Sequence, residues 1–223
     1  PISSVFIQSL YRIMAKYHPT YITHYYRRGT LPFQSLSSLP DQQAVDLMHL
    51  LADDTPFGAR FNDPEGYLHN RRTSEAWVRS EDIRKDGRPQ LDYPIYFVLG
   101  ESQWLVKNAP DRWMHQVIQI SLTTFDEGDL SFTYPDSMIS YWLGHDPTSV
   151  FYLPEFHGKV FTRQQILALV DRLGDPELGW GRKLPPELAP YIEAQVSNFE
   201  PLWGWLKTKA HAGWEQGAGW GKE

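Results

Sequence analysis

The stretch IYFVLG at residues 95–100 constrains the fold of this chain more than any other. Apolar and aromatic residues follow one another there without a polar break, and the run ends at a glycine. A strand that is covered on both faces needs such a run. The alternating stretch QVIQISL (116–122) predicts a second strand, and YITHYY (21–26) and LSFTYP (130–135) predict two more. We therefore expect a central sheet with helices around it.

Apolar residues spaced three and four apart, together with capping residues, predict the helices. The strongest signal is TRQQILALVDRLG, in which Thr162 and Gln165 form a capping box and Gly174 ends the helix. Asp136 is expected to cap a short helix with Met138, Ile139, Trp142 and Leu143 facing inward. The runs VFYL and HGKVF are expected to form an edge hairpin. The other predicted helices cover residues 3–17, 40–52, 64–85 and 188–199.

Together these elements predict an α+β fold, with a central mixed or mostly antiparallel sheet flanked by helices and a helical C-terminal segment. The loop GDPELGWGRKLPP is rich in glycine and proline and marks a boundary. We expect a main domain at 1–175 and a Trp-rich appendage at 176–223 that packs on it as part of one structural unit. The tail tryptophans, which either dock on the body or meet a partner, are Trp203, Trp205, Trp214 and Trp220.

Composition excludes several classes of function. The 223 residues carry a formal charge of −6, so we expect no general nucleic-acid binding. The chain has no cysteine, which excludes disulfides, thiolate metal sites and cysteine nucleophiles. No apolar run approaches the roughly 20 residues that span a bilayer, and the start PISSVFIQSL does not read as a secretory leader. We therefore expect a soluble, cytoplasmic protein without a membrane partner.

The stretch TYITHYYRRGTLPF offers the first candidate site. Alternation along its strand places Ile22, His24 and Tyr26 on one face, with Arg27 and Arg28 at the mouth of a possible pocket. Guanidinium groups pair bidentately with phosphate or carboxylate, so this arrangement suits a small anionic ligand. The alternative is a half-buried strand whose histidine only serves the core.

Two further groups are candidates for chemistry, since the phosphate-loop, HExxH, GxSxG and dinucleotide-binding motifs are missing. Glu101 follows the most apolar strand, where a loop can present a carboxylate as an acid or base, although an exposed turn glutamate is the alternative. The stretch GHDPTSVFYLPEFHGK brings together histidines and carboxylates that are weak candidates for a metal site or a proton-transfer pair. These residues are His145, Asp146, Glu155 and His157. The sequence assigns no cofactor.

The expected helix at 64–85 is unusual, because arginines and glutamates cover much of its surface. It predicts a lid, a surface helix or a partner-facing helix. A second class of function is therefore a non-catalytic interaction protein that uses this helix and the Trp-rich tail, including self-association through the tail.

Short fragments add a family resemblance. A strand with ITH, a helical insertion with arginines, the run IYF and a later FTY strand followed by a glutamate occur in this order. In this order they resemble NAD-consuming ADP-ribosyltransferases of the DNA-modifying type. The resemblance implies NAD near His24 and one of Arg71 or Arg72, with Glu155 as the catalytic glutamate.

Overall fold

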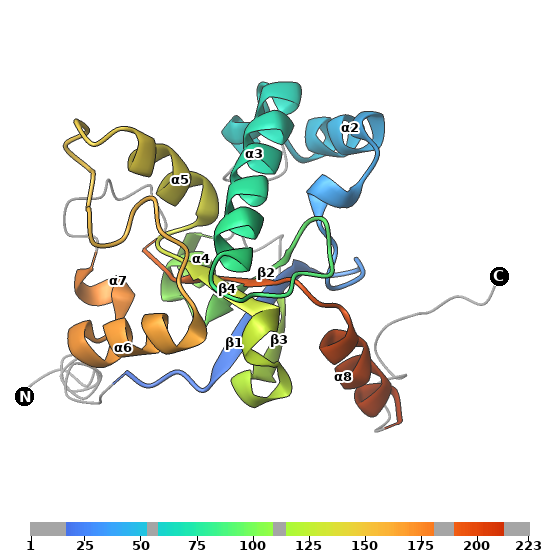
Figure 1. Cartoon of the computed structure of the whole chain (residues 1–223). Helices are drawn as coiled ribbons and strands as arrows, with labels where there is room; N and C mark the ends of the chain where they lie inside the picture. Colours follow the sequence, from blue (N-terminus) through green and yellow to red (C-terminus); the bar gives the residue numbers. More distant parts are fainter. Residues whose placement is uncertain (1–16, 53–57, 109–114, 181–189, 212–223) are drawn as a thin grey trace, which may run out of the picture.

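The chain folds around one five-stranded sheet with the strand order β3-β1-β2-β5-β4, in which every strand pair is antiparallel. The computed structural model describes residues 17–52, 58–108, 115–180 and 190–211 (Figure 1). The predicted α+β fold is confirmed. The strands are β1 (Tyr21–Arg27), β2 (Ile95–Leu99), β3 (His115–Ser121), β4 (Leu130–Thr133) and β5 (Glu193–Val196). The α-helices are α2 (Asp41–Ala52), α3 (Pro64–Ile83), α4 (Gln103–Asn108), α5 (Ser137–His145), α6 (Arg163–Leu173), α7 (Pro176–Gly179) and α8 (Glu200–His211).

One face of the sheet is apolar and carries the main core. Strand residues such as Ile22, Phe97 and Phe132 are almost fully buried on this face. Ile166 of α6 and Leu202 of α8 pack into the same cluster. In Figure 1, α6 and α8 accordingly lie on the lower side of the sheet. Burial of this apolar surface is the main favourable contribution to folding.

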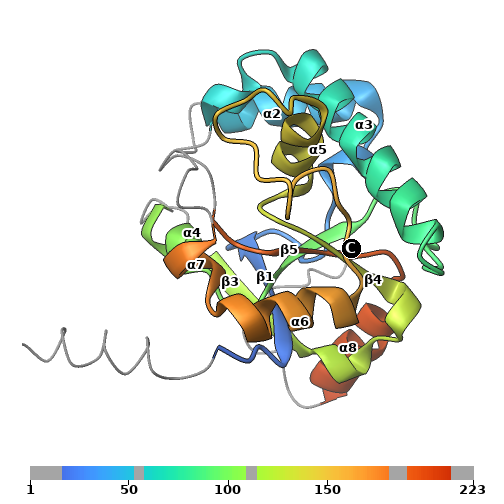
Figure 2. The ribbon, with the colours of Figure 1, turned by 60° about the vertical axis from the view of Figure 1, so that its left-hand side comes forward.

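The opposite face of the sheet is polar, although it is buried as well. The polar side chains that alternate with core residues along β2, β4 and β5 are Tyr96, Ser131, Thr133, Glu193 and Gln195. Helices α3 and α5 cover this face (Figure 2). The Tyr96 hydroxyl donates to Glu75 of α3 at 2.7 Å, and the backbone N–H of Ser137 in α5 donates to Glu193 at 2.9 Å.

Several predicted helix ends are confirmed by their caps. The Thr162 hydroxyl accepts from the backbone N–H of Gln165, and the Gln165 side chain reciprocates, which completes the capping box of α6. The Asp136 carboxylate accepts from the backbone N–H of Ile139 at 2.8 Å and caps α5. Asp63 caps α3 in the same way. Each cap supplies an acceptor for an N–H that the first helical turn leaves unpaired.

The helix predicted at 188–199 is wrong, because residues 193–196 form β5 in the interior of the sheet. This strand pairs with β2 on one side and β4 on the other. Its glutamate, alanine and glutamine favour helices intrinsically, and strand pairing between distant segments overrides that preference. The segment 176–223, which we expected to be an appendage, therefore contributes a strand to the sheet. Trp205 of α8 also packs against Phe33, at 6.3 Å between ring centroids.

Two smaller predictions are also wrong. Residues 150–158 form turns rather than a hairpin, and only Phe161 makes a β-bridge, to Phe132. The inward face of α5 carries Ser137 and Ser140, whereas Trp142 is 45% exposed. Serines suit this position because α5 packs on the polar face of the sheet.

Two expectations fall mostly outside the described residues. These are the helix expected at 3–17, of which only Tyr17 is described, and the tail positions Trp214 and Trp220. Trp203, on α8, is 51% exposed. None of the helices within the described ranges combines the length and the apolar character that a membrane crossing requires.

Candidate functional site

His24 of β1 lies on the apolar side of the sheet, with both ring nitrogens in hydrogen bonds. Its Nε2 accepts from the backbone N–H of Phe33 at 3.0 Å, so Nδ1 carries the proton and donates to the carbonyl of Tyr96 at 2.8 Å. Burial lowers the pKa of His24 to about 4. The imidazole is therefore neutral at pH 7 and holds β1, β2 and the Phe33 loop together.

The other residues of the first candidate site lie along β1. Tyr26 stacks on His24 at 5.7 Å between ring centroids and packs on the core. Arg27 and Arg28 are exposed at the far end of the strand. Other residues line the groove between α2 and α3 and the small cavity under α3.

Glu101 lies at the opposite end of β1 from the arginine pair. The Gly100 N–H donates to the Tyr21 carbonyl at 2.9 Å, which fixes the loop of Glu101 beside the start of β1. The Glu101 carboxylate is exposed and accepts from the Gln119 side chain at 2.9 Å. The span from Tyr21 to Arg27 is about 20 Å at roughly 3.3 Å per residue. The structure does not bring Glu101 and these arginines into one small-ligand site.

Arg71 and Arg72 attach α3 to the segment that precedes α2. Arg71 Nε donates to the Ser37 hydroxyl at 3.0 Å and lies 3.1 Å from Glu75, and its guanidinium covers the Tyr96 ring at 4.6 Å. Arg72 donates to the carbonyls of Ser37 and Leu39 and to Asp41. Arg71 and His24 lie on opposite faces of β2, because Arg71 covers the ring of Tyr96 and His24 packs on the ring of Phe97, the next residue of the strand.

The four metal candidates have separate local partners. His145 bonds to the carbonyl of Tyr141, the Asp146 carboxylate accepts from Thr148, and Glu155 pairs with Arg172. His157 is buried, and its Nδ1 accepts from the Leu153 N–H at 3.0 Å. Burial lowers the pKa of His157 to about 4. Within the described ranges, no three histidine or carboxylate side chains are grouped so that they could hold a metal ion.

A different polar cluster lies at the start of β5. Glu193 is buried, and its Oε1 accepts from the Ser137 N–H and from Gln195 Nε2, both at 2.9 Å. The Gln195 side chain also donates to the Thr133 hydroxyl at 2.9 Å and accepts from Ser131 at 3.2 Å. These bonds fix the carboxylate at the end of the sheet where β5 and β1 begin and β2 and β4 end.

A second carboxylate lies close to Glu193. Burial and the nearby negative charge of Asp136 raise the pKa of Glu193 to about 7. Burial also raises the pKa of Asp136, while the Ile139 N–H and the charges of Arg60 and Arg71 oppose that increase. Two close carboxylates do not ionise together easily, so the pair holds a proton near neutral pH.

Aromatic and cationic side chains surround this pair. Burial, followed by the charges of Glu193 and Asp136, raises the pKa of Tyr191 well above its usual value. Tyr191 also lies 6.4 Å from the ring of Trp104 in α4. Arg60 lies over the rings of Phe61 and Tyr67 at 4.8 and 5.7 Å. We call Glu193, Asp136, Arg60, Tyr191 and Tyr67 the Glu193 cluster. Such convergence of shifted acids with aromatic and cationic groups is typical of functional sites.

Our sequence predictions did not include the Glu193 cluster, because its glutamate fell in the expected C-terminal helix. A signal was nevertheless present in IEAQVS. Ile192, Ala194 and Val196 alternate there with three polar residues, which is the period of a half-buried strand. The other cluster members come from segments far apart in the sequence, so no spacing rule joins them.

A second polar feature lies under α3. Glu75 and Asp82 line a cavity of about 10 Å³ together with Ser131, Gln195 and Ser197. Glu75 Oε2 and Asp82 Oδ2 are buried and find no hydrogen-bond partner in the described part of the chain. Burial raises the pKa of Asp82 to about 6, against the attraction of Arg79. A cavity of this size holds roughly one water molecule, which would satisfy such an oxygen.

No model of a known protein family matches this chain, and no curated protein or solved structure matches it. The candidate site is therefore argued from its geometry.

Proposed function

We propose that the protein binds and acts on a small anionic ligand at the Glu193 cluster. The observation that carries this proposal is the buried Glu193 carboxylate, which is fixed by Ser137 and Gln195 and lies beside Asp136. Asp136 is itself fixed as the cap of α5, so two carboxylates are held close together at this end of the sheet. A carboxyl with a pKa near 7 both accepts and donates a proton at neutral pH, as a general acid–base catalyst must.

The charges around the cluster favour an anionic ligand. Arg60 is exposed, and its charge acts on both Asp136 and Tyr191. Arg71 acts on Asp136 as well, although its own bonds go to Ser37 and Glu75. We assign the anionic group of the ligand to Arg60, because guanidinium groups bind phosphate and carboxylate bidentately. The reacting part of the ligand then lies toward Glu193.

A ligand screen by thermal unfolding tests this proposal. The panel contains nucleotides, NAD, sugar phosphates and carboxylates, because a ligand at 100 times its Kd adds about 2.7 kcal/mol to stability. We expect at least one class to stabilise the wild type and to have little effect on Glu193→Gln. Glu155→Gln, which changes an exposed glutamate in the same way, serves as the matched control and keeps the response. A response that Glu193→Gln retains in full contradicts the proposal.

A more specific candidate follows from the resemblance to ADP-ribosyltransferases. The residues that the resemblance implies make other contacts in the structure. His24 packs in the core, and Glu155 pairs with Arg172. Arg71 and Arg72 bond to the segment that precedes α2. Glu193 suits the reaction better than Glu155, because it is buried, whereas Glu155 is exposed. A buried carboxylate beside the ribosyl carbon stabilises the oxocarbenium-like transition state.

In this candidate reaction, the bond between the ribosyl carbon and nicotinamide breaks. Nicotinamide leaves with the electron pair, and an acceptor attacks the ribosyl carbon and gives its proton to Glu193. Release of nicotinamide from NAD, measured by chromatography, tests this candidate. We expect release by the wild type and by Glu155→Gln and none by Glu193→Gln. If the wild type releases no nicotinamide while another anion binds the cluster, the NAD candidate fails and the broader proposal stands.

The interaction class of function also stays a proposal, and so does the expected cytoplasmic location. The interaction class is supported by exposed apolar side chains at the start of α8: Trp203 is 51% exposed, and Phe199, just before the helix, is 36% exposed. Sedimentation of the full chain over a range of concentrations tests self-association through this surface. If the chain associates with itself through this surface, we expect Trp203→Lys to weaken that association.

A further inference from the structure

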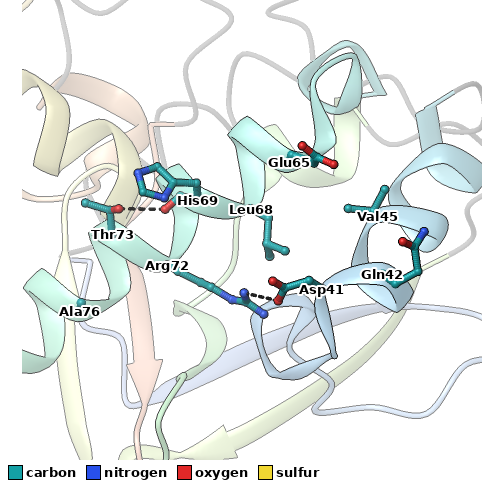
Figure 3. A pocket seen from close by; sticks show the side chains of 9 residues that line it. All are labelled: Asp41, Gln42, Val45, Glu65, Leu68, His69, Arg72, Thr73 and Ala76. Carbon is teal, nitrogen blue, oxygen red and sulfur yellow. Dashed lines mark hydrogen bonds and ion pairs between the residues drawn. The ribbon is translucent and has the colours of Figure 1, made fainter.

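An open groove runs between α2 and α3 (Figure 3), and none of the residues that line it belongs to the Glu193 cluster. Its volume is about 530 Å³, within the range typical of ligand sites. The residues that line it are Asp41, Gln42, Val45, Glu65, Leu68, His69, Arg72, Thr73 and Ala76.

The floor of the groove combines apolar side chains with the guanidinium of Arg72. Val45 and Leu68 belong to a small second core, in which Ala44, Met48 and Phe61 are buried between the two helices. Ala76 adds an exposed apolar position on α3, one helical turn beyond Arg72. A rigid floor of this kind keeps its shape before a partner arrives, which lowers the entropic cost of binding.

The rim of the groove presents negative charge. Arg72 lies at the base, 26% exposed, and donates to two backbone carbonyls besides Asp41. Asp41 is 80% exposed, so its carboxylate faces solvent even though one oxygen accepts from Arg72. Glu65 is exposed at the other end, in the first turn of α3, and Figure 3 shows it across the groove from Val45. Two exposed carboxylates therefore outweigh the single, less exposed guanidinium of Arg72, and the lining has a net negative charge.

The length of the groove favours an elongated partner. Its lining on α3 runs from Glu65 to Ala76, which is about 16 Å at 1.5 Å per residue. This matches roughly three turns of a helix lying along the groove. Helical peptides use apolar side chains spaced three and four apart to bind such grooves.

We propose that the α2–α3 groove binds a basic amphipathic helix of a protein partner. Apolar side chains of that helix would cover Val45, Leu68 and Ala76, and its lysines or arginines would pair with Asp41 and Glu65. The groove shares no lining residue with the Glu193 cluster, and it gives the charged helix α3 a specific role.

Fluorescence anisotropy with a labelled Leu/Lys peptide tests this proposal. The probe has about 14 residues, with leucines spaced for one helical face, and a Leu/Glu peptide of the same pattern is the charge control. Ala76→Arg blocks the floor and Glu65→Lys reverses the rim charge. Ser80→Arg, at an exposed position of α3 outside the lining, and Glu200→Lys on α8 are the matched controls. Circular dichroism establishes that each variant is folded.

We expect one-to-one binding of the Leu/Lys peptide, weakened at least about tenfold in Ala76→Arg and Glu65→Lys and changed by less than about twofold in both controls. Glu193→Gln should bind the peptide as the wild type does, so this proposal and the ligand proposal fail separately. Absence of saturable binding overturns the groove proposal. So does equal binding of the Leu/Glu peptide, or an equal loss in the control variants.

Discussion

The side-chain amide of Gln195 donates a hydrogen bond of 2.9 Å to the carboxylate of Glu193, two residues away on the same face of β5. Gln195 is itself fixed by Ser131 and Thr133 of β4. Since these side chains are buried, their bonds have little competition from water. The carboxylate that we assign to proton transfer is therefore held in place before any ligand binds.

Replacement of Glu193 with glutamine should stabilise the protein above pH 7. The folded-state pKa of Glu193 is about 7, above the usual value near 4.3, so ionisation costs folding free energy that grows as pH rises from about 4 to 7. The amide removes this cost, which the shift in pKa puts at roughly 3 kcal/mol at pH 8. Urea unfolding at pH 5 and pH 8 measures it.

The expected pattern is a stability gain that is largest at pH 8, clearly smaller at pH 5 and close to zero below about pH 4. A gain of equal size at both pH values contradicts an elevated pKa of Glu193, because the charge of the carboxylate would then not be its source.

Acidification should not protonate His24 until well below its usual pKa near 6.5. Its pKa of about 4 follows from burial, and both ring nitrogens already have backbone partners. Because the unfolded chain takes up this proton first, the stability contribution of His24 is lost as pH falls from about 6.5 toward 4. Imidazole NMR shifts should stay constant from pH 8 to about 5. A transition near 6.5 would show that His24 is accessible instead.

Local signals predicted much of the fold. The apolar run at 95–99 predicted a strand covered on both faces, and the Thr162–Gln165 capping box predicted the start of a helix. Both predictions succeeded because each signal lies within a single element. The short strand β5 carries helix-favouring residues, and its pairing with β2 and β4 spans most of the chain. That pairing could not be read from a local window.

The individual site residues were harder to predict than the elements. Alternation correctly placed Ile22, His24 and Tyr26 on one face of β1, and all three pack on the apolar core. The pattern does not reveal which face meets the core, since that depends on Phe97 and Phe33 from other segments. Arg71 likewise finds Ser37, which is 34 residues away in the chain.

Asp82→Asn should stabilise the protein at neutral pH. Asp82 is buried with an oxygen that lacks a partner among the described residues, and its pKa is raised to about 6. Ionisation therefore costs stability as pH rises from about 4 to 6, and the amide avoids that cost. With partial screening by solvent, we expect a gain on the order of 1 kcal/mol at pH 8 and none at pH 4. Thermal unfolding at the two pH values checks this, and destabilisation at pH 8 would contradict it.

Gly144→Ala should destabilise the protein, whereas Gly204→Ala should not. A Cβ on Gly144 would lie 2.3 Å from the Cα of Gly158, so α5 would have to move away from that loop. The expected cost is about 2 kcal/mol or more. Gly204 lies in α8 with no atom within 4 Å of the added Cβ, and alanine there should add roughly 0.5–1 kcal/mol. Urea unfolding compares the two; a neutral Gly144→Ala would contradict the close packing of α5.

The most direct test of the central claim compares two arginine sites with the phosphate-bearing or carboxylate ligand that stabilises the wild type most. Thermal unfolding is measured with and without that ligand for Arg60→Ala and for the double variant Arg27→Ala/Arg28→Ala. The Glu193 cluster predicts that Arg60→Ala loses most of the ligand-induced stabilisation while the double variant keeps it. A silent screen of the wild type, or loss in the double variant with full retention in Arg60→Ala, would contradict the account.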